Sequence, residues 1–417
     1  MPDRPRPARA WLRGPVLAVG FGALALAAVW SLYSVFMPLL LRDFVASRAL
    51  RGAIMGLDNL SALLLIPLVG AWSDRAHGRL GKRLPFLLVL MPVAVVAFAV
   101  LPLASGSLWG LLGAALVFVV AMTSSRAPLT ASMPDHVAPD QRSSANGVIT
   151  LLGAVGTAIA LLGLGPLFER APWAPFAVAS ALLLMAVVLL WVTLDRDPPY
   201  VGEHAPNDQA PAAKAVLRDV SALLRARPRG PLLLLLTVFF GFAGFSALEA
   251  QFSTYATETL GASEGQSGIL LGVASLAFIA VAIPVGALAR RAGEATVMLW
   301  GSLLLAVVSI VAAQVHAPAV LTPVLAAAGA AWALVVVPAY PLVVNQGGAD
   351  RVGFYTGMYY FAGSAAAIAA PSAVGAGMDA LGNAALFYAI AVAMAFGLGS
   401  IVLAQRLGLA SRAEAQP

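Results

Sequence analysis

The chain has 417 residues, of which 60% are hydrophobic and 11% charged, with a mean hydropathy of +0.89. Soluble domains are about 45–50% apolar, so this composition excludes a soluble protein and predicts a polytopic membrane protein. The net charge of +6 does not indicate nucleic acid here, because Lys and Arg collect in cytoplasmic loops of membrane proteins.

The hydrophobic runs predict twelve membrane-spanning helices. The first run follows a basic N-terminal stretch, as in a signal peptide, but it continues to Leu41. That length exceeds the hydrophobic region of a signal, so we expect an uncleaved first helix. The predicted spans are 15–41, 50–72, 84–104, 108–131, 144–167, 173–194, 231–257, 266–288, 295–315, 319–343, 353–376 and 383–405.

The distribution of basic residues predicts the orientation. With the N-terminus inside, 21 of the 25 Lys and Arg fall on the cytoplasmic side, and the exceptions are Arg42, Arg48, Arg51 and Arg170. By the positive-inside rule both termini are then cytoplasmic. We expect a multi-pass protein of the plasma (inner) membrane.

A long polar segment divides the spans six and six. It predicts an N-terminal bundle at 1–194, a cytoplasmic linker at 195–230 and a C-terminal bundle at 231–417. Residues 212–226 have helical spacing typical of a surface helix, although a plain linker is the simpler interpretation. The spacing of Gly70, Asp74 and Arg75 recurs faintly after the eighth span as Gly286, Arg290 and Arg291. Two pseudo-symmetric six-helix bundles with a midplane site are typical of transporters.

Charged residues gather in the stretch "GAWSDRAHGRLGKRLPF" between the second and third spans. Gly70 permits close approach of helices, and the carboxylate of Asp74 can pair with an arginine. We interpret the stretch as gating contacts that form in one transport state and break in another; the alternative is that its charges only fix topology. The candidate gating residues are Gly70, Asp74, Arg75, Arg79, Arg83, Arg126, Asp135 and Arg142. Arg126 is expected to pair with Asp74 or Asp135, unless it only extends to the membrane surface.

The G-x-x-x-D-R pattern of this stretch resembles the signature of the major facilitator superfamily. The longer "SDRAHGRLGKRLPF" is similar to the form in glycoside–pentoside–hexuronide:cation symporters and sucrose–proton symporters, as are "RAPLTASMPDHVAPDQRSSANG" and "GFYTGMYYF". The resemblance implies transport by alternating access. Lys82 and Leu84 depart from the sucrose-transporter pattern. The first and fourth spans lack the carboxylates that hold sugar in melibiose-type relatives, so no sodium or sugar site is carried over.

Asp58 and Glu249 are the acidic residues that lie well inside predicted spans. An ionisable side chain at this depth costs about 2.5–3.5 kcal/mol on insertion scales, so it is rarely without a role. Both lie roughly 12–13 Å from the outer boundary at about 1.5 Å per residue. We predict that they are proton-coupling groups; a structural hydrogen-bonding role is the alternative.

Aromatic and amide side chains in the spans are candidates for lining a substrate site, because sugars are held by polar groups and aromatic rings. Tyr and Trp are also common as interface anchors, which is the alternative for each ring. The candidates are Trp30, Tyr33, Asn59, Gln251, Tyr255, Trp332, Asn345, Tyr355 and Tyr359.

These patterns predict a secondary transporter, with proton-coupled symport of a sugar or glycoside as the first hypothesis and proton-driven export of drugs or metabolites as the alternative. The chain has no cysteine and its four histidines lie in or beside loops, so metal sites and His-based catalysis lack their parts. We expect no catalytic residue, no metal and no cofactor apart from the proton gradient. The expected partners are a small-molecule substrate and membrane lipid, not nucleic acid, and we expect a monomer.

Overall fold

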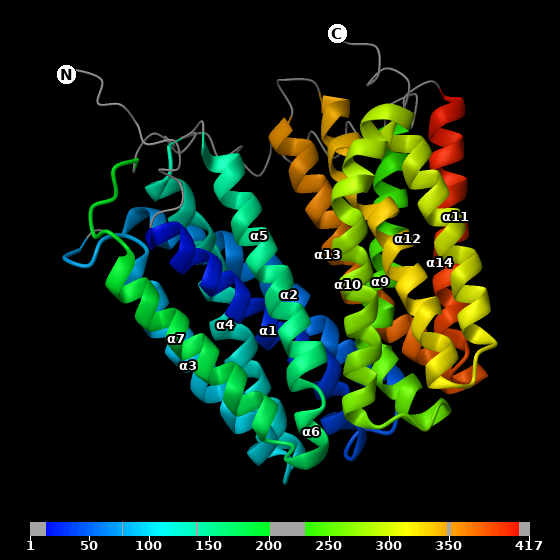
Figure 1. The fold of residues 1–417 in the computed structure, drawn as a ribbon, viewed down its shortest axis with the longest axis horizontal. Helices are drawn as coiled ribbons and strands as arrows, with labels where there is room; N and C mark the ends of the chain where they lie inside the picture. The colour runs from blue at the N-terminus through cyan, green and yellow to red at the C-terminus, as the bar shows by residue number, and fades with distance from the viewer. Residues whose placement is uncertain (1–13, 77, 139–140, 201–229, 348–351, 408–417) are drawn as a thin grey trace. The chain divides into compact units, whose positions relative to one another are not determined.

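The computed structural model describes residues 14–76, 78–138, 141–200, 230–347 and 352–407 (Figure 1). Every regular element in these residues is a helix, and twelve helices are long and apolar enough to cross a membrane. The predicted all-α fold with twelve spans is therefore confirmed. The predicted surface helix at 212–226 lies outside the described residues.

The helices before the central polar segment form the first six spans. In chain order they are α1 (Gly14–Arg42), α2 (Arg48–Arg75), α3 (Leu84–Ala104), α4 (Leu108–His136), α5 (Arg142–Ala158) with its continuation η2 (Ile159–Leu164) and α6 (Leu167–Arg170), and α7 (Ala174–Thr193). η2 is a π-helical turn in which the Gly165 N–H donates to the Ala160 carbonyl at 2.9 Å. Pro166 follows directly and ends this turn.

The helices after that segment form the other six spans. They are α9 (Gly230–Thr259), α10 (Glu264–Ala292), α11 (Glu294–Ala313), α12 (Pro318–Val344) with the short turn η3 (Asn345–Gly347), α13 (Val352–Leu381) and α14 (Ala385–Arg406). α10 starts at a capping box, in which Ser263 and Gln266 satisfy each other's backbone N–H groups. Gly293, at φ +88°, ends α10 and starts α11, a conformation that favours glycine.

The chain divides into two compact units, and the division falls inside helices. The first unit is Met1–Tyr33 with Ser61–Asp208, and the second is Ser34–Leu60 with Gln209–Pro417. α1 and α2 are each continuous across these boundaries. The segment Ser34–Leu60, which holds the end of α1 and the start of α2, therefore belongs to the second unit.

The first unit packs around aromatic side chains contributed by α1, α3, α4 and α7. Phe118 is central, with its ring centroid 5.2 Å from that of Tyr33 and 5.0 Å from that of Phe98, which in turn lies 4.9 Å from Phe176. Phe98, Phe118 and Phe176 are almost completely buried. Tyr33 and its neighbour Trp30 on α1 are held in place by packing against the ring of Phe118.

The second unit is held by close helix crossings at small residues. A Cβ on Gly329 of α12 would lie 1.9 Å from the Ala274 carbonyl oxygen of α10, so only glycine fits between these two backbones. Such crossings are typical of membrane helices, where lipid supplies no hydrophobic drive for helix association. An apolar core of α9, α11, α12, α13 and α14 residues fills the remaining space.

Candidate functional site

Arg83 organises the signature stretch within the first unit. Its Nε donates to Asp135 Oδ2 at 3.0 Å, its Nη1 donates to Ser73 Oγ at 2.6 Å, and Nη1 also forms an ion pair with Asp74. The Arg83 and Asp135 side chains are 13% and 9% exposed, whereas Asp74 is 54% exposed. Both carboxylates lie at helix C-termini, where the helix dipole disfavours negative charge, and Arg83 offsets this. The stretch thus joins the end of α2 to the end of α4.

The end of α4 is also fastened to the segments that follow it. Arg142 donates from Nε to the Val137 carbonyl at 3.1 Å and from Nη2 to the Pro134 carbonyl at 3.2 Å, which satisfies carbonyl groups at the helix end. The Asp195 N–H donates to His136 Nε2 at 3.1 Å, so the chain after α7 is anchored here as well.

The remaining candidate gating residues lie around this junction. Gly70 faces α4, where a Cβ would meet only Ala127 Cβ at 3.5 Å, an ordinary contact. Arg79 is exposed. The two carboxylates that we expected Arg126 to contact both bind Arg83, and the pairing of Arg126 stays a prediction.

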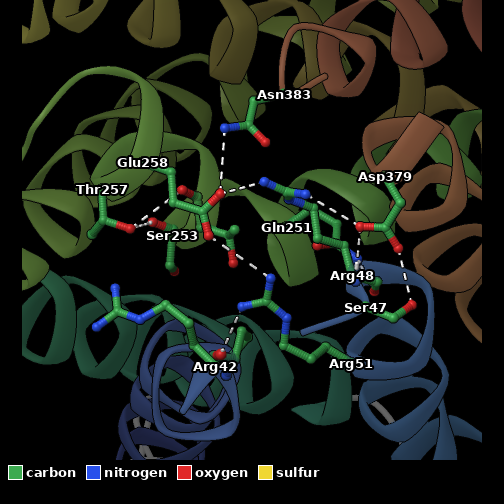
Figure 2. Close-up of polar contacts among 12 residues, drawn as sticks. Arg42, Ser47, Arg48, Arg51, Gln251, Ser253, Thr257, Glu258, Asp379 and Asn383 are labelled. Atoms are coloured by element: carbon green, nitrogen blue, oxygen red, sulfur yellow. Dashed lines mark hydrogen bonds and ion pairs between the residues drawn. The ribbon is translucent and has the colours of Figure 1, made fainter. Parts of the chain in front are cut away.

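Arg48 is the centre of a second charged cluster, which lies wholly within the second unit (Figure 2). Its Nη1 lies 3.2 Å from Asp379 Oδ1 of α13, and its Nη2 forms a close ion pair with Glu258 Oε2 of α9. Its carbonyl accepts a hydrogen bond from Gln251 Nε2 at 3.1 Å. We call this set of contacts the Arg48 cluster.

Two further arginines extend the Arg48 cluster. Arg51, whose side chain is 3% exposed, lies 3.9 Å from Glu258 Oε1 through Nη2 and donates from Nη1 to the Pro38 carbonyl at 3.5 Å. Arg42 Nη2 lies 3.1 Å from Glu264 Oε1. Arg42 Nε also lies 3.9 Å from Asp43 Oδ1, so three arginines face four carboxylates in this region.

Sequence reasoning singled out the Arg83 region and missed the Arg48 cluster as a site. A signal was present, because Arg42, Arg48 and Arg51 are three of the four basic residues that break the charge distribution of the other loops. Basic residues that cluster where the positive-inside rule does not place them indicate acidic partners nearby. No local sequence pattern identifies these acidic residues, because they meet the arginines only in the tertiary structure.

The two candidate proton-coupling carboxylates both lie in the second unit. Glu249 is part-buried on α9 and is hydrogen-bonded to the Ser34 hydroxyl of α1. Asp58, on α2, accepts from the side-chain amide of Asn59 at 2.6 Å. Neither arrangement tests proton binding, so the coupling role stays a prediction for each.

Candidate lining residues of the second unit fall into two groups. Trp332 is part-buried and its ring stacks on Phe245 at 5.0 Å with an interplanar angle of 6°. Tyr359 is buried between Phe242 and Tyr340, at centroid distances of 5.9 and 5.3 Å. These rings of α9, α12 and α13 form a continuous aromatic cluster.

The other candidates in the second unit are fixed by structural contacts or lie at its edge. Gln251 is buried and donates to two carbonyls, those of Arg48 and Pro371. Tyr255 is buried and its hydroxyl donates to the Val315 carbonyl at 3.3 Å. Tyr355 belongs to the apolar core and Asn345 is exposed at the end of α12.

Two candidate lining residues belong to the first unit. Tyr33 is 2% exposed and packs edge-on against Trp30 at 5.7 Å. Trp30 is part-buried, and its Nε1 is a buried donor without a hydrogen-bond partner in the described structure. The lining role of each candidate remains a prediction.

Comparison with known proteins identifies the family. The family model of the Major Facilitator Superfamily matches residues 19–371 and again residues 252–413. The chain belongs to the Major Facilitator Superfamily. It is therefore a multi-pass membrane transporter of a small molecule and not an enzyme.

Two curated relatives differ in what their names say they carry. The chain is similar to the sucrose transport protein SUC3 of Arabidopsis thaliana, with 26% identity over 198 residues, which is 39% of this chain and 32% of that protein. It is also similar to the class D tetracycline resistance protein of Salmonella ordonez, with 28% identity over 272 residues, 64% of each chain. The matched regions thus span less than two thirds of either relative.

Solved structures share the fold at low sequence identity. The nucleoside transporter NupG superposes with a TM-score of 0.72 at 12% identity, covering 97% of this chain and 100% of that one. A mutant of the peptide transporter POT has a TM-score of 0.72 at 16% identity and 94% coverage of both chains. These likenesses bear on the fold alone.

Proposed function

We propose that this transporter imports a sugar or glycoside together with protons by alternating access. The observation that carries the alternating-access part is the division of α1 and α2 between the two compact units. These helices are continuous, yet the Arg48 cluster joins only their segment Ser34–Leu60 to α9 and α13 of the second unit. If each helix moves as a rigid rod with the first unit, these polar contacts must break.

In this proposal the two charged regions gate opposite ends of the transporter. With both termini cytoplasmic, the Arg48 cluster lies at the outer end and the Arg83 contacts lie at the cytoplasmic end. We further propose that the transporter consists of two six-helix bundles, at 1–194 and 231–417, joined by a cytoplasmic linker at 195–230. Ion pairs and hydrogen bonds suit such gates, because each contributes modestly and is replaced by water on opening.

Proton coupling is assigned to Asp58 and Glu249. An ionisable carboxylate within a membrane span is costly and is rarely without a role, which supports a functional part for both residues. Glu249 faces α1 through its hydrogen bond to Ser34, and protonation changes the charge at that contact. Entry of a proton down its gradient then accompanies entry of substrate.

The sugar is supported by three motif patches that resemble sugar symporters and by the match to a plant sucrose transport protein. The aromatic cluster of Trp332 and Phe245 offers ring faces of the kind that pack against sugars. A second candidate function is proton-driven export. It is favoured by the match to a tetracycline resistance protein, which covers more of this chain.

Proton movement in proteoliposomes tests the proposal. We expect one member of a panel of mono- and disaccharides to alkalinise the outside when added, and Asp58→Asn or Glu249→Gln to abolish this while sugar exchange persists. An Asp197→Asn variant serves as a control, since Asp197 is an exposed carboxylate after α7 that belongs neither to the proposed coupling pair nor to the contacts of Arg48 or Arg83. Proton movement evoked by tetracycline and by none of the sugars would replace import with export.

A further inference from the structure

The N-terminus of α2 is capped by a side chain from another helix. The first backbone N–H groups of a helix have no partner within it. In α2 the Arg48 N–H donates to Asp379 Oδ1 at 3.1 Å and the Ala49 N–H donates to Asp379 Oδ2 at 3.2 Å. The next N–H, of Leu50, donates to Ser47 Oγ at 3.3 Å. The capping is therefore divided between Ser47 of the same chain segment and Asp379 of α13.

Both carboxylate oxygens of Asp379 accept hydrogen bonds from the start of α2 and from Ser47. Besides the two N–H groups, Ser47 Oγ donates to Oδ2 at 2.9 Å and Arg48 Nη1 donates to Oδ1 at 3.2 Å (Figure 2). All four partners are donors. Only an ionised carboxylate accepts all of them, and its negative charge is also favoured by the positive end of the helix dipole.

The backbones behind this cap are in direct contact. A Cβ on Gly52 would lie 2.2 Å from the Pro371 carbonyl oxygen, and one on Gly375 would lie 2.4 Å from the Arg48 carbonyl oxygen. The N-terminal turn of α2 therefore rests on α13 without intervening side chains. Asp379 supplies polar contacts at the end of this close backbone crossing.

We propose that Asp379 of α13 caps α2 only while it is ionised, so that a proton arriving from that side of the membrane releases α2 from α13. The inference rests on the proposed function, since it makes this release the opening of the outer gate. Glu258 is the other titratable group that shares Arg48. The other charged groups around this site are Arg51, Arg42 and the two carboxylates that contact Arg42, Glu264 and Asp43.

The direction of the pH effect follows from the charge. The ionised carboxylate stabilises the closed contact, so this stability is present at higher pH and is lost as the pH falls and Asp379 binds a proton. Acid outside should therefore favour the open state. Asp379→Asn, which is neutral at all pH values, should be open at high pH as well.

Thiol labelling measures this opening directly, because the chain has no cysteine of its own. Met55 of α2, 6% exposed, lies between Gly52 and Gly56, so a Met55→Cys reporter is protected while the contact is closed. Its labelling rate with a membrane-impermeant maleimide is divided by that of an exposed Gly106→Cys reference at the same pH. This ratio removes the effect of thiol ionisation on the rate.

Because an aspartate in the open state takes up its proton near about pH 4, we expect the ratio to stay level between about pH 7.5 and about pH 5. It should then rise about three- to tenfold as the pH falls to about 3, the scale of a lost cap and charge–dipole contact. Asp379→Asn should raise the ratio at pH 7.5 and remove its pH dependence. Glu169→Gln is the control, because this carboxylate is exposed on α6 in the first unit and is not part of the Arg48 cluster, and it should leave the ratio unchanged.

Several results would overturn the inference. A ratio that does not rise with acid in the Met55→Cys parent is one, and this result needs no change at Asp379. Loss of the pH dependence in Glu258→Gln, with its retention in Asp379→Asn, would move the effect to Glu258. The assay contains no substrate, so failure to find a transported sugar leaves its result intact and the two failures are distinguishable.

Discussion

Arg83 shows how one side chain serves two helix ends at once. Its guanidinium contacts Asp135 and Asp74 through separate nitrogens and also donates to Ser73. The planar fork of arginine presents donors from three separate nitrogens in a fixed geometry, whereas lysine offers its three donors from one nitrogen. The buried carboxylate of Asp135 consequently depends on Arg83 for its charge compensation.

We predict that Arg83→Ala destabilises the protein and stops transport. Removing one partner of a buried ion pair costs about 3–5 kcal/mol, because the other charge is left buried. Arg83→Lys keeps the charge and should retain an intermediate melting temperature in detergent. Arg79→Ala is the control, since Arg79 is exposed and should melt like the parent. Equal melting of Arg83→Ala and Arg79→Ala would show that the Asp135 contact contributes little.

The contrast between the two charged regions explains what sequence could predict at this scale. The Arg83 stretch is local, with Asp74 and Arg83 nine positions apart in a recognisable motif. The Arg48 cluster joins side chains more than two hundred positions apart, such as Arg48 and Glu258, so no local pattern connects them. Gln251 illustrates the same limit, because its polarity suggested a ligand while the structure gives its amide two carbonyl partners.

Helices of this protein depend on glycine where two backbones meet. Hydropathy predicted all twelve spans, because burial in lipid requires long apolar runs. It did not predict which glycines lie at crossings, since a glycine in open space and one at a contact look alike in sequence. Gly329 of α12 lies at a crossing, whereas Gly399 of α14 has open space around it.

We predict that Gly329→Ala lowers thermal stability and Gly399→Ala does not. The added methyl group at Gly329 meets the Ala274 carbonyl oxygen at 1.9 Å, so α10 and α12 must separate, and overpacking of this kind costs typically about 1–3 kcal/mol. No atom lies within 4 Å of a Cβ on Gly399. Melting of both variants in detergent checks this, and a Gly329→Ala protein as stable as Gly399→Ala would contradict the close crossing.

At the scale of the whole molecule, the charge distribution and the Arg48 cluster bear on orientation together. Three of the four basic residues that depart from the expected cytoplasmic bias are Arg42, Arg48 and Arg51. Each of them faces a carboxylate of Glu258, Glu264 or Asp379. Their charge is thus compensated within the fold, which leaves the remaining bias of Lys and Arg in favour of cytoplasmic termini.

We predict that single cysteines at Gly78 and Gly106 are labelled from opposite sides of the membrane. Both glycines are exposed, have negative φ and leave open space for a side chain, so neither substitution disturbs the fold. Only α3 separates them, and its 21 residues span about 30 Å, one crossing of the bilayer. In right-side-out vesicles an impermeant maleimide should label Gly106→Cys, whereas Gly78→Cys should react only after detergent is added. The reverse pattern would place both termini outside and assign the Arg83 contacts to the outer end, and labelling of both from one side would exclude α3 as a span.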